Sequence, residues 1–161
     1  MLEIKDLSIS INDRYLVKNL NLVLNKGDKL AIIGEEGNGK STLLKSILGI
    51  CKYAEISGAI NLKGNSIGYL EQTISDDKLD KKVYDFLFVN EMDYYDKINN
   101  LYKYLELIDL NDGILAQKIG TLSGGEKVKI SILKLLLNEY DILFLDEPTN
   151  DLDIETLEWL E

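Results

Sequence analysis

The sequence predicts an α/β domain in which buried strands alternate with amphipathic helices. Two short runs, residues 30–33 and 142–145, contain only apolar residues, as in strands that are covered on both faces. Helical periodicity occurs at residues 40–50 and 126–138, where apolar side chains recur every three or four positions. Strands and helices that alternate in this way are typical of a layered α/β fold.

The N-terminal region predicts a hairpin that precedes the first buried strand. Residues 2–25 alternate apolar and polar side chains on either side of Asn12 and Asp13. This pattern predicts two antiparallel strands, each with one face toward solvent. The run at 30–33 is expected to form a buried strand that ends at Gly34.

The next elements are a helix and two further strands. The periodicity over residues 40–50 predicts a helix that stops at Gly49. Strands are expected at residues 56–62 and 67–70, because both segments are rich in apolar residues and a polar turn separates them.

Residues 76–112 differ in composition, being rich in Asp, Lys, Asn and Tyr with helically spaced apolar positions. They predict two or three small helices, followed by a loop at 120–125, a helix at 126–138 and the start of another helix at 154–161. We expect one domain over residues 1–161. Its predicted parts are a core of residues 1–74 and 119–161 and a helical subdomain of residues 75–118.

Composition excludes several classes of function. The 161 residues include 28 acidic and 18 basic ones, a net charge of −10, which argues against a nucleic-acid surface and gives no reason to expect direct DNA binding. No apolar run is long enough to span a membrane, and the N-terminus does not resemble a signal peptide. The single cysteine, Cys51, fits the reducing cytoplasm, where we expect the protein. Without histidine, catalysis must use carboxylates, lysines, hydroxyls or backbone groups.

Residues 34–41, called the phosphate loop below, match the pattern G-x-x-x-x-G-K-[ST]. Glycines let successive backbone N–H groups point at phosphate oxygens, and the following helix directs its positive end at them. Lys40 is expected to reach the β- and γ-phosphates, Ser41 to bind Mg²⁺, and Thr42 to contact a phosphate. We expect the side chains of Glu35 and Glu36 to point outward. The complete set of expected phosphate-binding residues is Gly34, Gly37, Asn38, Gly39, Lys40, Ser41 and Thr42. The alternative is a glycine-rich turn without a ligand.

The apolar run 142–145 ends in two carboxylates, Asp146 and Glu147. Ligands of open α/β sheets bind at the carboxyl ends of strands, which is where these side chains would lie. Asp146 is expected to hold Mg²⁺, directly or through water, and Glu147 to polarise the attacking water in phosphoryl transfer. The alternative is an ordinary charged turn after a strand.

Five features in this order resemble an ATP-binding cassette (ABC) ATPase domain. They are the phosphate loop, Gln72, the sequence LSGGE at 122–126, the sequence ILFLDE at 142–147 and the sequence PTNDLD at 148–153. The resemblance covers the whole chain, and LSGGE between the other motifs is highly specific. It implies a RecA-like P-loop NTPase core with a small antiparallel β subdomain and an inserted helical subdomain.

The resemblance also implies roles for individual residues. Tyr15 resembles the aromatic residue that stacks on adenine, and Gln72 resembles the glutamine that senses Mg²⁺ and the attacking water. The alternative for Tyr15 is an ordinary strand tyrosine. The alternative for Gln72 is an ordinary polar loop residue. Asn150 to Asp153 resembles the loop that couples two cassettes, with Asp153 contacting the partner.

The family pairs two cassettes, in the same chain or in a dimer. Each ATP then lies between the phosphate loop of one cassette and Ser123, Gly124 and Gly125 of the other. In isolation, this second glycine motif would be interpreted as a helix cap with Ser123 as N-cap. The resemblance implies that ATP joins the cassettes and that hydrolysis separates them, as in other phosphate-driven switches.

The resemblance further implies that a complete cassette continues beyond residue 161, with another core strand and a histidine that contacts the γ-phosphate. We therefore expect this chain to be the first part of a longer one, and hydrolysis to need the completed, paired cassette. Two positions depart from the family pattern, since Glu36 stands where the family often has Asn and Asn38 stands where it has a small residue.

Two classes of function remain open. The segments GYLEQ at 68–72 and EPTNDLD at 147–153 resemble the soluble ABC-F type, which acts on ribosomes in translation and antibiotic protection. We favour that class, as the first of two fused cassettes. The alternative is the ATPase subunit of a membrane transporter, whose partner is a membrane domain. A DNA-repair ATPase is a distant third because residues 73–121 lack heptads, and a non-enzymatic binder is the remaining alternative.

Overall fold

The computed structural model describes residues 1–147. Its internal contacts divide the chain into two compact units, Met1–Ile67 and Gly68–Glu161, which we describe one at a time. Within residues 1–147, every helix is too short or too polar to cross a membrane. The division into a core of 1–74 and 119–161 and a helical subdomain of 75–118 remains a prediction.

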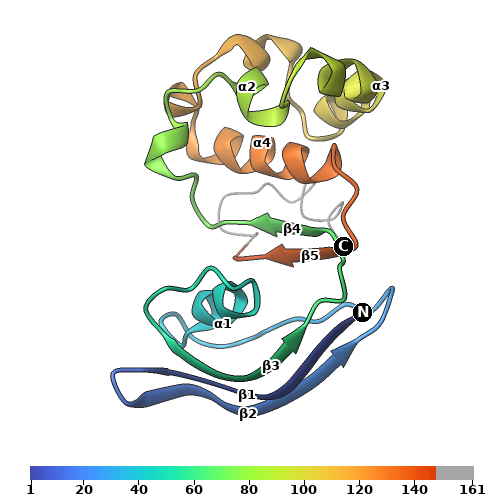
Figure 1. The fold of residues 1–161 in the computed structure, drawn as a ribbon. Coiled ribbons are helices and arrows are strands. Elements are labelled where there is room, and N and C mark those ends of the chain that lie inside the picture. Colours follow the sequence, from blue (N-terminus) through green and yellow to red (C-terminus); the bar gives the residue numbers. More distant parts are fainter. Residues whose placement is uncertain (148–161) are drawn as a thin grey trace. The chain divides into compact units, whose positions relative to one another are not determined.

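The first unit contains a three-stranded antiparallel sheet with the order β2-β1-β3 (Figure 1). The strands are β1 (Leu2–Ile11), β2 (Arg14–Leu24) and β3 (Glu55–Asn61). Asn12 and Asp13 join β1 to β2 with φ values of 46° and 62°. Positive φ at both positions matches the right-handed twist of the strands, so the two-residue turn is favoured. The predicted hairpin and the predicted strand at 56–62 are confirmed.

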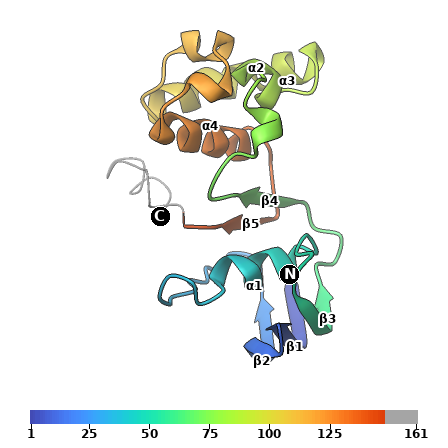
Figure 2. The same cartoon turned by 90° about the vertical axis from the view of Figure 1, so that its left-hand side faces the viewer.

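The core of the first unit lies between this sheet and helix α1 (Lys40–Ile47). Figures 1 and 2 show α1 over one face of the sheet. The buried side chains from the two elements are Leu2, Ile4, Leu7 and Ile9 from β1 and Leu43, Leu44 and Ile47 from α1. Gly49 follows the helix with a φ of 71°, the left-handed conformation that ends helices, so the predicted stop is confirmed.

The expectation of a buried strand at residues 30–33 is wrong. No strand forms there, and Leu30, Ile32 and Ile33 are 52%, 38% and 94% exposed. A strand that is covered on both faces needs a hydrogen-bonded neighbour on each side. Among the described residues of the first unit, the sheet contains only β1, β2 and β3, and none of them pairs with this run.

The second unit contains a pair of short strands, β4 (Ile67–Leu70) and β5 (Ile142–Leu145). The N–H of Asp146 donates to the carbonyl oxygen of Leu70 at 3.1 Å. This bond joins the carboxyl ends of the two strands, so they run parallel. Both predicted strands are confirmed, although Leu143 in β5 is 52% exposed.

Three helices accompany this strand pair: α2 (Val83–Leu87), α3 (Glu91–Leu107) and α4 (Gly124–Leu136). In Figures 1 and 2, α4 lies between the strands and the other two helices. Short 3₁₀ turns connect these elements at Asp76–Lys78, Asp112–Ala116 and Ile119–Thr121. The predicted helices within residues 76–112 are therefore present.

Helix α4 separates two apolar clusters of the second unit. One face packs with α2 and α3 through the buried residues Val83, Leu87, Leu101, Leu105, Ile130 and Leu133, among others. The other face packs against the strands, with Ile132 and Leu135 beside Leu70. A helix that is apolar on two faces is typical of an interior position. The helix expected at 154–161 lies outside the described residues.

Candidate functional site

The phosphate loop is closed by hydrogen bonds of its own backbone and of Lys40. The ammonium of Lys40 donates to the carbonyl oxygens of Gly34 and Glu35, both at 3.0 Å. The N–H of Asn38 donates to the carbonyl oxygen of Glu35 at 3.3 Å. These bonds hold the lysine charge at the centre of its own loop, where an anion could meet it. The side chains of Glu35 and Glu36 are exposed, as expected.

Two glycines give the phosphate loop its curvature. Gly37 and Gly39 have φ values of 79° and 84°, which side chains with a Cβ rarely adopt. At Gly39 an added Cβ would also stand 2.9 Å from a methyl carbon of Leu16 on β2. The loop therefore needs glycine at 39 both for backbone conformation and for space.

Helix α1 begins at Lys40, directly after the loop, and its N-cap residue is Gly39. A glycine has no side chain that could cap the first turn of the helix, and a helix N-terminus suits an anion. Thr42 is buried, and its hydroxyl lies 3.2 Å from that of Tyr53, where either can donate. The side chain of Thr42 thus has a protein partner that the sequence did not reveal.

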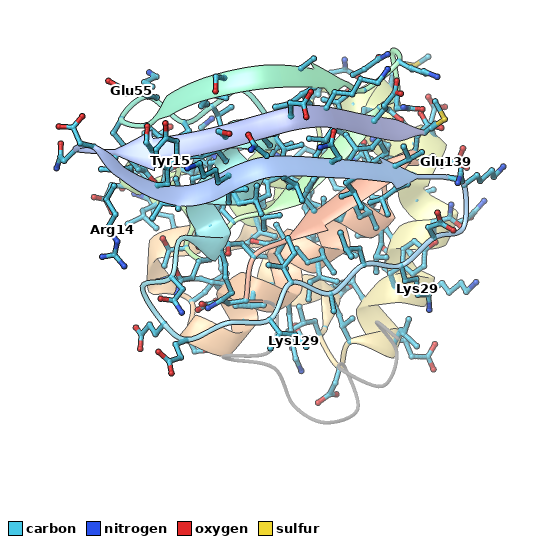
Figure 3. All side chains as sticks on the ribbon, turned by 90° about the horizontal axis from the view of Figure 1, so that it is seen from below. Arg14, Tyr15, Lys29, Glu55, Lys129 and Glu139 are labelled. Atoms are coloured by element: carbon cyan, nitrogen blue, oxygen red, sulfur yellow. The ribbon has the colours of Figure 1, made fainter. Side chains whose placement is uncertain are left out.

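Tyr15, the predicted adenine-stacking residue, lies at the start of β2 and is 57% exposed. Figure 3 shows it with Arg14 and Glu55 at one end of the three-stranded sheet. The ammonium of Lys18 lies 5.1 Å from the centre of its ring, within range of a cation–π contact. The ring is therefore exposed at the surface, with Lys18 over one of its faces, and its role in adenine stacking stays a prediction.

In the second unit, Asp146 follows β5 and is only 2% exposed. The hydroxyl of Tyr69 on β4 donates to its Oδ2 at 3.2 Å. A buried carboxylate is costly unless it is hydrogen-bonded, and this phenol supplies a donor from the neighbouring strand. Tyr69 lies in the GYLEQ segment, but no role was predicted for its hydroxyl. Its position on a strand that ends just before Gln72 was the sequence feature that could have indicated a place near the site.

The two predicted catalytic residues are in direct contact. Gln72 Nε2 donates to Glu147 Oε2 at 3.1 Å, although 75 positions separate the two residues in sequence. Glu147 has a φ of 50°, a conformation that costs energy for a residue other than glycine. The parallel strands β4 and β5 end side by side, and each residue follows its strand closely, which explains how they meet.

Ser123 is the N-cap of α4, and Gly124 and Gly125 are the first two helical residues. Its hydroxyl donates to Glu126 Oε2 at 2.7 Å, its N–H donates to the same oxygen at 2.8 Å, and the N–H of Glu126 donates back to Ser123 Oγ at 3.3 Å. The hydrogen bonds from Ser123 lower the pKa of Glu126 below its ordinary value of 4.5. The helix consequently starts two residues before the predicted 126.

The capping box restricts what Ser123 can offer a ligand. A serine hydroxyl has one proton to donate, and here Glu126 receives it. Gly124 and Gly125 lie at the positive end of α4. Because these two residues have no side chains of their own, they do not obstruct an anion at their backbone N–H groups. Residues 150–153, including the predicted partner contact Asp153, lie outside the described residues.

The predicted metal ligands suit magnesium chemically. Ser41, Gln72 and Asp146 provide a hydroxyl, an amide oxygen and one carboxylate. Mg²⁺ is commonly held by one or two carboxylates together with waters and substrate phosphates, so this sparse set fits. Within residues 1–147, no group of three His, Cys, Asp or Glu side chains forms a metal cage. Each of these groups is therefore of a donor type that suits a metal arriving with a phosphate ligand.

Comparison with known proteins places these features in one family. The family model described as "ABC transporter" matches residues 17–150. The ribosome protection protein VmlR of Bacillus subtilis is 38% identical over 161 residues, which cover 99% of this chain and 28% of VmlR. ABC transporter F family member 2 of Arabidopsis thaliana is 35% identical, with coverage of 98% and 23%. The chain thus spans about a quarter of the length of these curated relatives.

Solved structures agree on the fold. A structure described as the ATP-binding subunit of an ABC transporter is 26% identical, has a TM-score of 0.82 and is matched over 99% of this chain and 71% of its own. A dimeric post-hydrolysis ATP-binding cassette bound to ADP and Pi is 23% identical with a TM-score of 0.77, which supports the fold alone. The fold class is therefore the RecA-like P-loop fold with a small antiparallel sheet, as expected. Family model, relatives and fold together show that the chain belongs to the ATP-binding cassette family of ATPases.

Proposed function

We propose that this chain binds Mg-ATP as a cassette of the ABC-F type, and that it hydrolyses the nucleotide when complete and paired with a second cassette. The observation that supports this most directly is the phosphate loop. It places Lys40 and the start of α1 after two glycines of positive φ. A lysine charge and a helix N-terminus together favour a bound phosphate.

In this proposal the first unit holds the nucleotide. Backbone N–H groups of residues 34–42 bind the phosphates, and Lys40 turns from its own loop carbonyls toward the β- and γ-phosphates. Tyr15 stacks on the adenine with the ring face that Lys18 leaves open, a contact worth roughly 1–3 kcal/mol. Ser41 would hold Mg²⁺ through its hydroxyl.

The second unit supplies the hydrolytic residues. Glu147 accepts a proton from the attacking water, and Gln72 keeps that carboxylate oriented through the hydrogen bond at 3.1 Å. Asp146, whose carboxylate accepts a hydrogen bond from Tyr69, would hold Mg²⁺ directly or through water. Mg²⁺ would supply charge neutralisation of the phosphates when it is bound.

A second cassette completes the site. Gly124 and Gly125 present N–H groups at the N-terminus of α4, and they bind the γ-phosphate held by the partner cassette. Ser123 adds its hydroxyl once Glu126 releases it. ATP thereby joins two cassettes and hydrolysis separates them, which is the switch that we propose.

The ABC-F assignment draws on the relatives. They include VmlR, whose name describes ribosome protection, and the protein named ABC transporter F family member 2. The ribosome is therefore the partner that we propose for the complete protein, and the cytoplasm its location. The ATPase subunit of a membrane transporter is the second candidate, because solved transporter subunits share the fold.

Calorimetric titration with Mg-ATP tests nucleotide binding. The variant Lys40→Ala should lose measurable affinity, because it removes the charge at the centre of the phosphate loop. Lys45→Ala is the matched control, since it removes the same charge from the last turn of the same helix. An unchanged affinity in Lys40→Ala would refute the proposed role of the loop.

The two candidate classes are separated by a sedimentation assay on the full-length protein. With non-hydrolysed ATP, an ABC-F protein should pellet with purified ribosomes through a sucrose cushion. Exclusive recovery in a detergent-solubilised complex with a membrane protein would favour the transporter subunit. A second phosphate loop downstream in the same reading frame would independently favour the ABC-F class.

A further inference from the structure

The second unit contains a pocket that none of the predicted nucleotide-binding residues lines. Its volume is about 120 Å³, and it opens beside the segment that follows β4, between helices α2 and α4. A single water needs only roughly 10–15 Å³ of such space, so the pocket has room for a small ligand. The polar and charged residues that matter below are Glu71, Thr73, Lys78, Lys134 and Tyr140.

Lys134 is positioned firmly at this pocket. It lies on α4, and its ammonium stands 4.1 Å from the centre of the Phe86 ring on α2. Both side chains line the pocket. A cation–π contact at this distance fixes the charge at the wall, and the aromatic ring shields one side of it from water.

The pocket is a local positive site in an acidic chain. Its lining contains two lysines, Lys78 and Lys134, and one carboxylate, Glu71, whereas the whole chain has a net charge of −10. Burial lowers the pKa of Lys134, and the nearby charges of Lys78, Lys81 and Lys97 lower it further. Lys97 is already paired with Asp93 at 2.5 Å, which leaves Lys78 and Lys134 as the two cations that line the pocket.

We propose that this pocket binds a small tetrahedral oxyanion, such as phosphate, between Lys134 and Lys78. The hydroxyls of Thr73 and Tyr140, which also line the pocket, can donate hydrogen bonds to its remaining oxygens. Two ammonium groups and neutral hydroxyl donors are suited to a compact anion, because lysine acts as a point charge. The site does not depend on the proposed nucleotide site.

The position of the pocket gives its occupant a way to influence Gln72. Glu71 and Thr73, the two neighbours of Gln72, line the pocket, and Tyr69 in the same wall binds Asp146. An anion that draws Lys78 and Thr73 inward would shift the backbone on both sides of Gln72. The amide signal of Gln72 should therefore respond to the occupant, although its side chain does not line the pocket.

The test is a phosphate titration followed by two-dimensional amide NMR, performed on the whole chain in a Lys40→Ala background. That background removes phosphate binding at residues 34–41. Saturable shifts are expected at Thr73, Lys134 and Tyr140, and at Gln72. Sulfate should compete with phosphate, and sodium chloride at equal ionic strength should not reproduce the shifts. Shifts that chloride reproduces, or that do not saturate, would overturn the proposal.

Three variants make the test specific. Lys134→Met keeps the apolar stem and should weaken phosphate binding about tenfold or more, because it removes a charged ligand. Lys103→Met removes the same charge elsewhere in the unit, beside Tyr104, and should leave the affinity unchanged. Glu71→Gln removes the one opposing carboxylate of the lining and should tighten binding. Unfolding scans confirm that each variant is folded. Equal affinities in Lys134→Met and Glu71→Gln would contradict the assignment.

The same titration with AMP shows whether the pocket takes free phosphate or a phosphate group on a larger molecule. Shifts at the same residues with AMP would show that the pocket accepts a terminal phosphate on a larger molecule. Shifts with inorganic phosphate alone would show that it takes the free anion. Both results support an oxyanion site, and the absence of saturable shifts with either probe would refute it.

Discussion

Gln72 and Glu147 meet through one hydrogen bond of 3.1 Å, from the amide nitrogen of Gln72 to the carboxylate of Glu147. The parallel pairing of β4 and β5 produces this contact, because Leu70 at the end of one strand bonds to Asp146 after the other. Glu147 is held there with a φ of 50°, an unfavourable backbone conformation. Such strain is typical of residues that are positioned for function and not for stability.

The first prediction concerns the carboxylate of this pair. In a complete, paired cassette, Glu147→Gln should retain Mg-ATP binding and trap the dimer with nucleotide between the cassettes. Hydrolysis should fall by about 10²–10⁴-fold, the usual contribution of a general base. Turnover is measured by phosphate release, and the trapped dimer by size-exclusion chromatography with ATP.

A charge control accompanies this measurement. Glu106→Gln removes an exposed carboxylate from α3, far along the sequence from the proposed site, and should hydrolyse ATP normally. If Glu147→Gln turned over at the wild-type rate, Glu147 would have no part in the mechanism. Gln72 would then need another partner to explain its position.

Local patterns predicted much of the fold. The alternation around Asn12 and Asp13 predicted the hairpin, and the phosphate loop with the periodicity after it predicted α1. These signals are strong because turn chemistry and periodicity act over a few neighbouring residues. The run at 30–33 failed for the opposite reason. An apolar run becomes a buried strand only if strands from elsewhere in the chain pair with it, and among the described residues none does.

Partner side chains were the least predictable part of the candidate site. Motifs predicted roles for Gln72, Asp146 and Glu147, but none for the hydroxyl of Tyr69, although Tyr69 lies within the GYLEQ segment. Its hydrogen bond to Asp146 depends on the register between β4 and β5, and the sequence pattern of neighbouring residues does not determine that register. The contact between Ser123 and Glu126 was predictable, because a serine followed three residues later by a glutamate is the pattern of a capping box. The same residues belong to the family motif LSGGE, and only that motif was interpreted.

The second prediction separates backbone strain from nucleotide binding at the phosphate loop. Gly39→Ala places a Cβ at a φ of 84° and close to Leu16. Left-handed backbone costs a residue with a Cβ roughly 1–2 kcal/mol, so the free energy of unfolding should fall by about that amount. ATP affinity should fall as well, because the shifted backbone moves the N–H groups that face the phosphates.

Gly49→Ala is the matched control for this variant. Gly49 also has a positive φ, at 71°, but nothing lies within 4 Å of an added Cβ, and it follows the other end of α1. Its stability cost should be similar, while its ATP affinity should stay unchanged. Urea unfolding and calorimetry measure the two quantities. Equal loss of affinity in both variants would show that Gly39 acts only through stability.

The third prediction concerns the capping box of α4 and its dependence on pH. Glu126 accepts hydrogen bonds from the N–H and the hydroxyl of Ser123, and these bonds lower its pKa in the folded protein. A depressed carboxyl pKa means that the folded state favours the charged form. The resulting stabilisation is present above the ordinary pKa of 4.5 and is lost as the pH falls through the lower, folded value.

The melting temperature of the wild type should therefore exceed that of Glu126→Gln at pH 7, and the difference should shrink below about pH 4.5. Protonation makes the wild-type side chain neutral like glutamine, so the two proteins converge in acid. Glu106→Gln, which replaces an exposed glutamate on α3 with no part in a capping box, is the control variant. A gap between wild type and Glu126→Gln that stayed constant from pH 7 to pH 3 would mean that packing, not charge, holds the cap.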